Sequence, residues 1–201
     1  MNTDRITNIA FGLTFINLSI VGITSIQPEA LFLSMVRFGA VLCNIVMGIT
    51  LLFNKDARSD ASPLHRPFWL GMIICNIIAV KMVNETLPLV CIQSAIYITG
   101  IITTLISVAS LGQSFSVTPM ISTIKTSAIY KLVRHPMYLG ETLMLIACGF
   151  ASKSLIIISV IIVYLYITVL RILEEEKVLR HEDAYIKYCH ETKWRLIPYI
   201  W

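Results

Sequence analysis

Charge is scarce in this sequence. Only 14% of its 201 residues are Asp, Glu, Lys or Arg, whereas 56% are hydrophobic and the mean hydropathy is +0.77. Soluble domains usually carry about a quarter charged residues, so this composition excludes an ordinary soluble protein. We predict an integral membrane protein whose residues 1–201 form a single domain, since a chain of this length suits one domain.

The patterns that define several kinds of site are also missing. The five cysteines form no C-x-x-C pair, four of them lie in apolar segments, and the four histidines lack metal-ligand spacing. We therefore expect neither a disulfide framework nor a metal site. No G-x-G-x-x-G occurs, which argues against a soluble Rossmann enzyme. The net charge of +4 lies on membrane-flanking loops, where contact with anionic lipid is expected rather than nucleic acid.

Long apolar runs are what the sequence does contain. A helix needs about 20 residues to cross a hydrocarbon core of ~30 Å. The candidate segments are residues 6–25, 31–53, 67–83, 89–111, 138–151 and 155–173. The fifth is short and is followed closely by the sixth, so the two predict a tight helical hairpin. The expected fold is an all-α membrane protein with five or six transmembrane helices and an amphipathic cytosolic tail.

Basic residues gather in alternate loops. Residues 54–67 and 112–137 are rich in lysine and arginine, whereas the loops between them carry almost none; the basic residues are Lys55, Arg58, Arg66, Lys125, Lys131 and Arg134. Cytoplasmic loops carry the excess of positive charge in membrane proteins. Both termini and the basic loops are therefore predicted to face the cytoplasm.

Ionisable residues within apolar segments are candidates for function. Arg37, Lys81 and Glu85 lie near segment ends, where their charged groups are expected to reach outward to water. The stretch RHPMYLGE, residues 134–141, is different. Proline favours the first position of a helix, so a helix is predicted to start at Pro136, and its free N–H groups beside Arg134 and His135 would bind an anion. A simple basic membrane anchor is the alternative.

The stretch RILEEEK, residues 171–177, is the second such place. Helix C-termini disfavour anions, so the helix is predicted to continue past the glutamates through Leu179. Arg171 would then lie one turn from Glu175 on the same face. A structural salt bridge and a pocket for a zwitterionic cofactor both fit this pattern.

The tail after this helix is amphipathic and rich in aromatic residues. Tyr185, Tyr188 and Trp194 are of the type that lies at the level of lipid headgroups. The tail is expected either to float at the interface or to fold back over the pocket.

These stretches belong to a larger pattern, which consists of SLGQSF (110–115), TSAIYKLVRHPMYLGE (126–141), LRILEEEKVL (170–179) and DAYIKYCHETKWRLIP (183–198). In combination they resemble the isoprenylcysteine carboxyl methyltransferase family, and most of all its short bacterial-type members, which share their C-terminal half with phospholipid N-methyltransferases. The resemblance covers about residues 105–201. It departs from the family at Ala128, where glycine is usual, and in the absence of a Phe-Gly pair before the tail.

The resemblance implies a membrane enzyme that transfers a methyl group from S-adenosylmethionine at the cytosolic face of the bacterial plasma membrane. Residues 1–110 would supply N-terminal transmembrane helices, and residues 111–201 the cofactor-binding and catalytic region. The catalytic residues of such an enzyme would be Arg171 and Glu175. Arg171 would orient the acceptor, and Glu175 with Glu176 would hold the ammonium or sulfonium region of the cofactor. The cofactor-binding residues carried over by position are Arg134, His135, Pro136, Tyr138, Gly140 and Glu176.

The acceptor is left open by the sequence. A pocket at the bilayer surface favours a lipid or lipidated acceptor with a carboxyl, amine or thiol group, and a small hydrophobic thiol also fits. Two other interpretations remain: an NADPH-dependent sterol or steroid reductase, whose C-terminal region is similar, and a membrane protein without enzymatic activity. The oligomeric state is not indicated.

Overall fold

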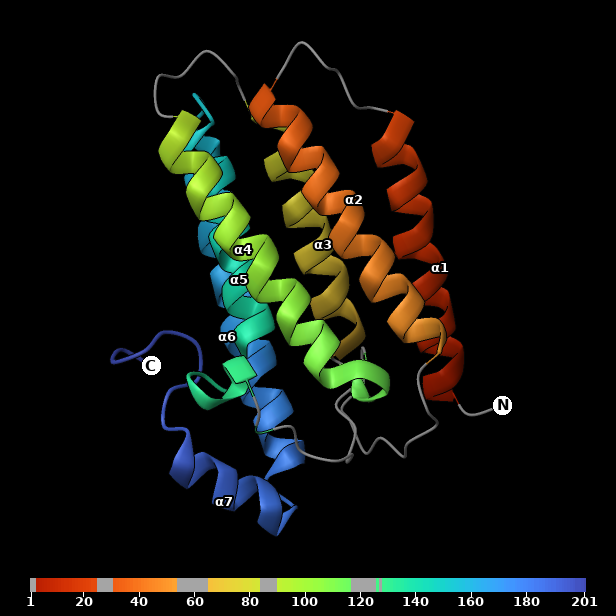
Figure 1. Cartoon of the computed structure of the whole chain (residues 1–201), viewed down its shortest axis with the longest axis vertical. Helices are drawn as coiled ribbons and strands as arrows, with labels where there is room; N and C mark the ends of the chain where they lie inside the picture. The colour runs from red at the N-terminus through yellow and green to blue at the C-terminus, as the bar shows by residue number, and fades with distance from the viewer. Residues whose placement is uncertain (1–2, 25–30, 54–64, 84–89, 117–125, 127) are drawn as a thin grey trace.

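The chain folds into an elongated bundle of helices, as the computed structural model in Figure 1 shows. The structure describes residues 3–24, 31–53, 65–83, 90–116, 126 and 128–201. Within these ranges every regular element is helical, which confirms the predicted all-α class. The elements are α1 (Thr3–Thr24), α2 (Leu31–Leu52), α3 (His65–Lys81), α4 (Val90–Leu111), the short 3-10 turns η1 (Gly112–Ser114) and η2 (Ala128–Lys131), α5 (Pro136–Phe150), α6 (Ile156–Leu179) and α7 (Asp183–Glu191).

Each predicted apolar segment corresponds to one of the helices α1 to α6. Among the described helices, α1, α2, α4 and α6 are long and apolar enough to cross a membrane, while α3 and α5 are shorter apolar helices. Successive helices run in opposite directions, so the N-terminus and α7 lie toward the same end of the bundle (Figure 1). The shortness predicted for the fifth segment is confirmed, and the choice between five and six crossings stays a prediction.

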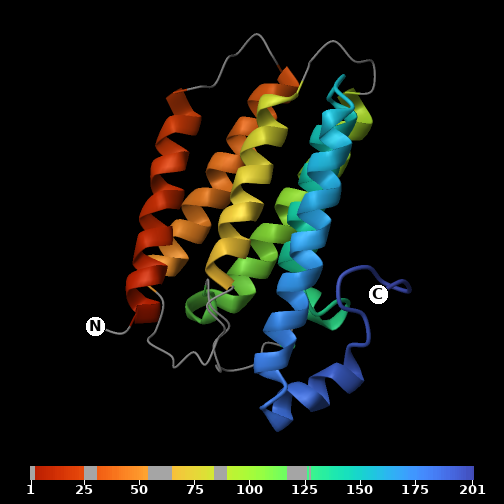
Figure 2. The ribbon, with the colours of Figure 1, turned by 180° about the vertical axis from the view of Figure 1, so that it is seen from behind.

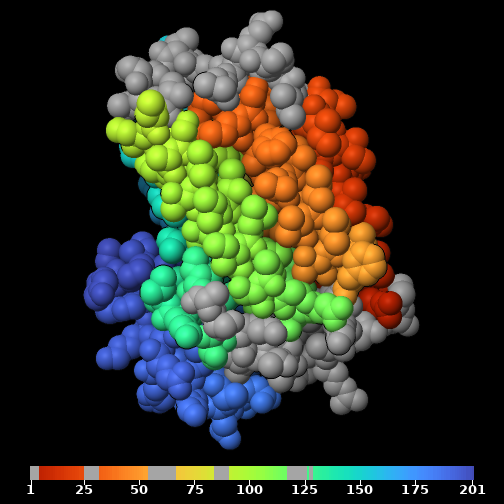
Figure 3. Space-filling model, in the orientation of Figure 1, coloured from red at the N-terminus to blue at the C-terminus, as the bar shows by residue number. Residues whose placement is uncertain are grey.

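The helices pack mainly in pairs. α1 packs on α2, α4 on α5, and α3 on α6, and α2 joins the first two pairs by also contacting α4. Figure 2 shows α3 and α6 on the opposite side of the bundle from α4. In the space-filling view, α2 and α4 cover one face, and the tail gathers against η2 at one end (Figure 3). α5 and α6, which follow residue 128, therefore pack against α4 and α3 from the earlier part of the chain.

Close contact between α4 and α5 depends on two glycines. A Cβ atom added to Gly140 would lie 2.3 Å from the Thr104 hydroxyl oxygen and 2.7 Å from the Gly100 carbonyl oxygen. A Cβ atom added to Gly100 would lie 2.7 Å from the Gly140 carbonyl oxygen. Small residues of this kind let helix backbones approach each other in membranes. They fix α5, and with it the residues at its start, against α4.

The ends of α5 and α6 agree with the sequence-based prediction. α5 begins at Pro136, with His135 outside the helix at φ −124°. α6 runs unbroken through the three glutamates to Leu179. Both predictions are confirmed, and together they bring RHPMYLGE and RILEEEK to the same end of the bundle.

Several predicted surface positions can be placed. Lys81, the last residue of α3, is exposed, and Arg37 on α2 is half-buried. Lys55, Arg58, Glu85 and Lys125 lie outside the described residues. The sidedness drawn from these loops therefore stays a prediction.

Candidate functional site

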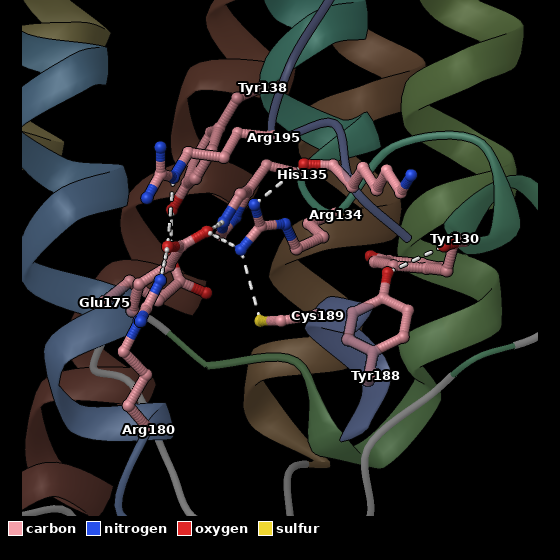
Figure 4. Close-up of polar contacts among 11 residues, drawn as sticks. Tyr130, Arg134, His135, Tyr138, Glu175, Arg180, Tyr188, Cys189 and Arg195 are labelled. Carbon is pink, nitrogen blue, oxygen red and sulfur yellow. Dashed lines mark hydrogen bonds and ion pairs between the residues drawn. The ribbon is translucent and has the colours of Figure 1, made fainter. Parts of the chain in front are cut away.

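The carboxylate of Glu176 is buried. It pairs with Arg134, His135, Arg180 and Arg195, which Figure 4 labels. Its Oε1 atom is 2.9 Å from Nη1 of Arg134 and 3.4 Å from Nε2 of His135. Its Oε2 atom is 3.0 Å from Nε of Arg195 and 3.5 Å from Nη2 of Arg180. A buried charge is tolerated when it is paired and hydrogen-bonded in this way. Glu176 thus joins the start of α5, the end of α6 and the tail.

The anion that faces Arg134 and His135 is therefore the chain's own Glu176. Arg134 is buried, and it also donates to the Cys189 sulfur at 3.1 Å and to the Lys193 carbonyl oxygen at 2.9 Å. The sequence located the cationic side of this arrangement and placed glutamates opposite it. A role for Arg134, His135 and Glu176 in holding a cofactor stays a prediction.

Glu175 has different surroundings from its neighbour. It is half-buried, and its Oε2 atom accepts a hydrogen bond of 2.9 Å from the Tyr138 hydroxyl. Nε of Arg171 donates to the same hydroxyl oxygen. Arg171 and Glu175 lie on one face of α6 as predicted, and the buried Tyr138 of α5 links them. The two predicted catalytic residues are therefore parts of one hydrogen-bonded unit.

Arg171 is held between two aromatic rings. Its guanidinium carbon lies 4.8 Å from the centroid of the Trp69 ring and 5.7 Å from that of Tyr138. Arg171 is only 1% exposed, so these contacts are made away from water, where a cation over an aromatic face is stabilised most. Trp69 comes from α3, in the half of the chain where the sequence analysis identified no site residue.

The position of Trp69 is fixed by other aromatic residues. Phe11, Phe15 and Phe115 meet its ring edge-on, at centroid distances of 6.3, 5.8 and 6.1 Å. The signal in the sequence was a tryptophan two residues after the proline that opens an apolar segment, which by itself also fits an ordinary interfacial anchor. Only the packing of α3 on α6 distinguishes the two.

The rings of His135 and Tyr138 stack beside the carboxylates. Their centroids are 5.8 Å apart and their planes differ by 19°. Aromatic faces next to a half-buried carboxylate form a favourable environment for an organic cation. The groups of His135, Tyr138 and Glu175 are therefore suited to an ammonium or sulfonium group.

The other two residues predicted to shape the site differ in position. Pro136 occupies the first turn of α5, where its missing N–H group costs nothing. Gly140 lies against Thr104 and Gly100 of α4. Its evident structural role is the contact between helices, and a role in cofactor binding stays a prediction.

The tail folds back onto the start of α5, which is the second of the two arrangements considered for it. The backbone N–H groups of Arg134 and His135 donate to the carbonyl oxygens of Trp194 and Arg195, at 2.9 and 2.8 Å. Tyr185 and Tyr188 are buried against Tyr130, so their rings pack within the protein, and the predicted headgroup level of the tail stays a prediction. Burial raises the pKa of Tyr188, so its hydroxyl stays protonated and donates to the Tyr130 carbonyl oxygen at 2.7 Å.

Deeper in the bundle lies a second polar pair. The Tyr164 hydroxyl of α6 donates to Oε2 of the buried Glu141 of α5 at 2.9 Å. Several helical hydroxyls, such as those of Thr142 and Ser107, bond to the carbonyl oxygen four residues before them. The Trp69 indole nitrogen, on the residue whose ring lies beside Arg171, is instead buried without a hydrogen-bond partner among the described residues.

In the part of the chain that the structure describes, no group of three or more His, Cys, Asp or Glu side chains is arranged to hold a metal ion. The site is built instead from two arginines, a histidine, a tyrosine and two glutamates at the shared end of α5 and α6.

One known protein family matches part of the chain. A model of the phospholipid methyltransferase family matches residues 87–182. This range contains α4, α5 and α6, and therefore both His135 and Glu175. This family includes proteins similar to isoprenylcysteine carboxyl methyltransferase, so the resemblance found in the sequence is confirmed. The match includes neither Trp69 nor the tail residues from 183 onward. No curated protein matches the chain.

Proposed function

From the match of residues 87–182 to the phospholipid methyltransferase family, we propose that this protein is an S-adenosylmethionine-dependent methyltransferase acting at the cytosolic membrane face. The family implies a membrane methyltransferase. The observation that carries the proposal further is the unit of Arg171, Tyr138 and Glu175, next to the stacked rings of His135 and Tyr138. Family match and site chemistry support the same reaction.

The residues at the shared end of α5 and α6 fit the proposed cofactor. When bound, S-adenosylmethionine supplies an electrophilic methyl group on a positively charged sulfur. Glu175 offers a half-buried carboxylate to that charge, and the faces of His135 and Tyr138 offer further stabilisation. Arg134 and Glu176 hold the start of α5 in place, and Pro136 sets where that helix begins.

Arg171 has the task of orienting the acceptor in this proposal. Methyl transfer from a sulfonium needs the donor carbon, the leaving sulfur and the nucleophile in line, so positioning supplies most of the acceleration. The guanidinium is fixed by Trp69 on one side and Tyr138 on the other, which leaves it little freedom. A rigid arginine can hold the polar head of an acceptor in one orientation.

The acceptor class determines whether a base is needed. A carboxylate or thiolate is already anionic and requires no proton transfer. An amine loses a proton as it is methylated, and Glu175 is the half-buried carboxylate in position to accept it. A lipid or lipidated acceptor fits best, because large apolar residues such as Ile162 and Tyr166 are exposed on α6, where a bilayer would lie.

Calorimetric titration with S-adenosylhomocysteine and with S-adenosylmethionine tests the proposal. We expect the purified protein to bind both S-adenosylhomocysteine and S-adenosylmethionine. We expect Glu175→Gln to weaken binding of S-adenosylmethionine about tenfold, equivalent to about 1.4 kcal/mol, because the carboxylate that faces its positively charged sulfur is lost. Glu174→Gln is the matched control: it removes the same charge one residue away, from a side chain that pairs with the exposed Lys177. We expect the control to bind like the wild type.

A parallel titration with NADPH separates the alternatives. Binding of NADPH without binding of S-adenosylhomocysteine would replace the methyltransferase proposal with a reductase. Binding of neither ligand by folded protein would favour a role without catalysis.

A further inference from the structure

The end of the chain presents apolar side chains to the outside. Ile197 is 39% exposed, Tyr199 86% and Ile200 75%. We refer to residues 197–200 as the tail tip. Figures 1 and 2 both show this segment projecting sideways from the bundle, beside α6 and near the level of η2, whereas α7 lies beyond the ends of the other helices. The tail tip therefore extends along the side of the bundle rather than below it.

This exposure belongs to a defined structure and not to a loose end. The Trp201 carbonyl oxygen accepts hydrogen bonds from the N–H groups of Arg195, Leu196 and Ile197, at 2.9, 3.0 and 3.2 Å. The Arg195 guanidinium lies 5.3 Å from the centroid of the Trp201 ring. Tyr199 has φ +66°, a left-handed conformation that is unfavourable for a residue with a side chain. The fold holds Tyr199 outward at a cost in backbone strain.

The tail tip lies beside α6, a candidate membrane span with an apolar surface (Figures 1 and 2). Exposed apolar side chains lie along the candidate membrane span α6; they are Ile158, Ile162, Val163 and Tyr166. Exposed apolar residues at the end of a membrane span, with tyrosine and tryptophan among them, are typical of the headgroup region. Lys131 on η2 and Lys193 before the tip are exposed cations that suit anionic lipid.

We propose that the tail tip inserts into the headgroup region of the lipid bilayer and thereby holds the tail against the start of α5. Trp194 and Arg195 shortly precede the tail tip in the sequence, and their carbonyl oxygens accept hydrogen bonds from the N–H groups of Arg134 and His135. Arg195 also binds the Glu176 carboxylate at 3.0 Å. Insertion of the tip therefore favours the arrangement in which the tail is hydrogen-bonded to residues 134 and 135.

Coupling of this kind has a thermodynamic consequence. Lipid contact that stabilises the docked tail also strengthens binding of any ligand that requires the docked tail. If the site binds a methyl donor, its affinity for that donor depends on the tip. This second part rests on the proposed function, whereas insertion itself does not.

Fluorescence quenching tests insertion directly. The chain has three tryptophans, so Trp69→Phe leaves only Trp194 and Trp201, both in the tail segment. The variant is placed in nanodiscs of phosphatidylcholine and phosphatidylglycerol whose acyl chains carry bromine either near the headgroup or near the chain end. We expect stronger quenching by the shallow bromine. An absence of quenching by either lipid would overturn the proposal.

Titration with S-adenosylhomocysteine in the same nanodiscs tests the coupling. We expect the double variant Tyr199→Ser, Ile200→Ser to bind about threefold or more weakly than the wild type, because its tip gains less from the bilayer. The matched control is Leu155→Ser, Ile156→Ser, which removes two similarly exposed apolar residues, 81% and 66%, from the other end of α6. We expect the control to bind like the wild type.

The outcomes distinguish the two proposals. Shallow quenching without any binding of S-adenosylhomocysteine by the wild type would contradict the methyltransferase function and leave insertion standing. Shallow quenching with equal binding by the wild type and the tip variant would contradict the coupling. Equal losses of binding in the tip variant and the control would show a general effect of lipid contact, and would also contradict it.

Discussion

Three consecutive glutamates in α6 have three different environments. Glu174 pairs with the exposed Lys177, Glu175 accepts from the Tyr138 hydroxyl, and Glu176 is buried among cations. Successive side chains on a helix point about 100° apart. Glu174 therefore faces solvent, Glu175 faces α5, and Glu176 faces the tail and the start of α5. The same side-chain chemistry therefore serves surface, candidate catalytic and structural positions within one turn.

Glu176→Gln is expected to destabilise the protein strongly. The substitution leaves the buried Arg134 without its carboxylate partner, and an uncompensated buried charge costs about 3–5 kcal/mol. Chemical unfolding of the detergent-solubilised protein, monitored by circular dichroism, measures the loss. Glu174→Gln removes only a surface pair and should cost about 0–1 kcal/mol. Equal stability of the two variants would contradict a structural role for Glu176.

Trp69 is expected to affect catalysis through Arg171. Trp69→Leu removes the ring under the guanidinium, a contact that contributes about 0.5–2 kcal/mol, so methyl transfer should slow by about 2- to 30-fold. Trp69→Phe keeps an aromatic face and should restore most of the rate. The measurement is incorporation of labelled methyl groups into a membrane extract, with affinity for S-adenosylhomocysteine measured alongside and expected to change little.

A control separates this effect from loss of packing. Phe11→Leu weakens the same aromatic cluster without touching the ring face beneath Arg171. A rate for Phe11→Leu as low as that for Trp69→Leu would assign the effect to the cluster as a whole.

At the scale of elements, the contact between α4 and α5 determines where the site lies. Gly100 and Gly140 let the two backbones meet closely. His135 directly precedes α5, and Tyr138 lies in its first turn. The tail adds a second constraint by pairing its backbone with residues 134 and 135. The start of α5 is therefore held from the bundle side and from the tail side.

Gly140→Ala is expected to lower stability by about 1–3 kcal/mol, because backbone atoms of α4 stand in the way of the added methyl group. Gly149→Ala is the control in the same helix. The atom nearest to its added methyl group is Cδ1 of Ile161, the far end of a flexible side chain. Unfolding midpoints of the two variants give the comparison, and a larger loss for Gly149→Ala would contradict the assignment.

At the scale of the whole molecule, the alternating helices bring both ends of the chain toward one end of the bundle (Figure 1). Residues from α3, α5, α6 and the tail meet at that end around Arg171 and Glu176. The connection between α5 and α6, which contains Lys153, lies at the other end. An enzyme that draws its cofactor from the cytosol must present the first of these ends to the cytoplasm.

Cysteine labelling tests this orientation. In a background without the five native cysteines, Lys187→Cys on α7 and Lys153→Cys between α5 and α6 place one thiol at each end. An impermeant maleimide added to intact cells should label only the Lys153 variant, while disrupted cells should label both. The opposite pattern would place the candidate site outside the cytoplasm.

The sequence by itself determined the class of the fold and the local geometry of the two stretches that form the candidate site. Apolar runs long enough to span a bilayer leave the backbone few options besides helices, so the helices could be read directly. Proline at position 136 and the glutamates at 174–176 are local signals, and they predicted where α5 starts and where α6 ends. Because the relevant groups lie within one turn of each other, Arg171 and Glu175 could be assigned to one face.

Only the tertiary structure decided which partners these residues meet. The three arginines around Glu176 come from the start of α5, from the tail and from the end of its own helix, and no local pattern specifies that Arg195 of the tail returns to it. Trp69 contacts Arg171 because α3 packs on α6, and Tyr185 and Tyr188 are buried because the tail folds onto η2. Side-chain periodicity reports which face of a helix is apolar, whereas the choice among several apolar neighbours depends on how all the helices pack together.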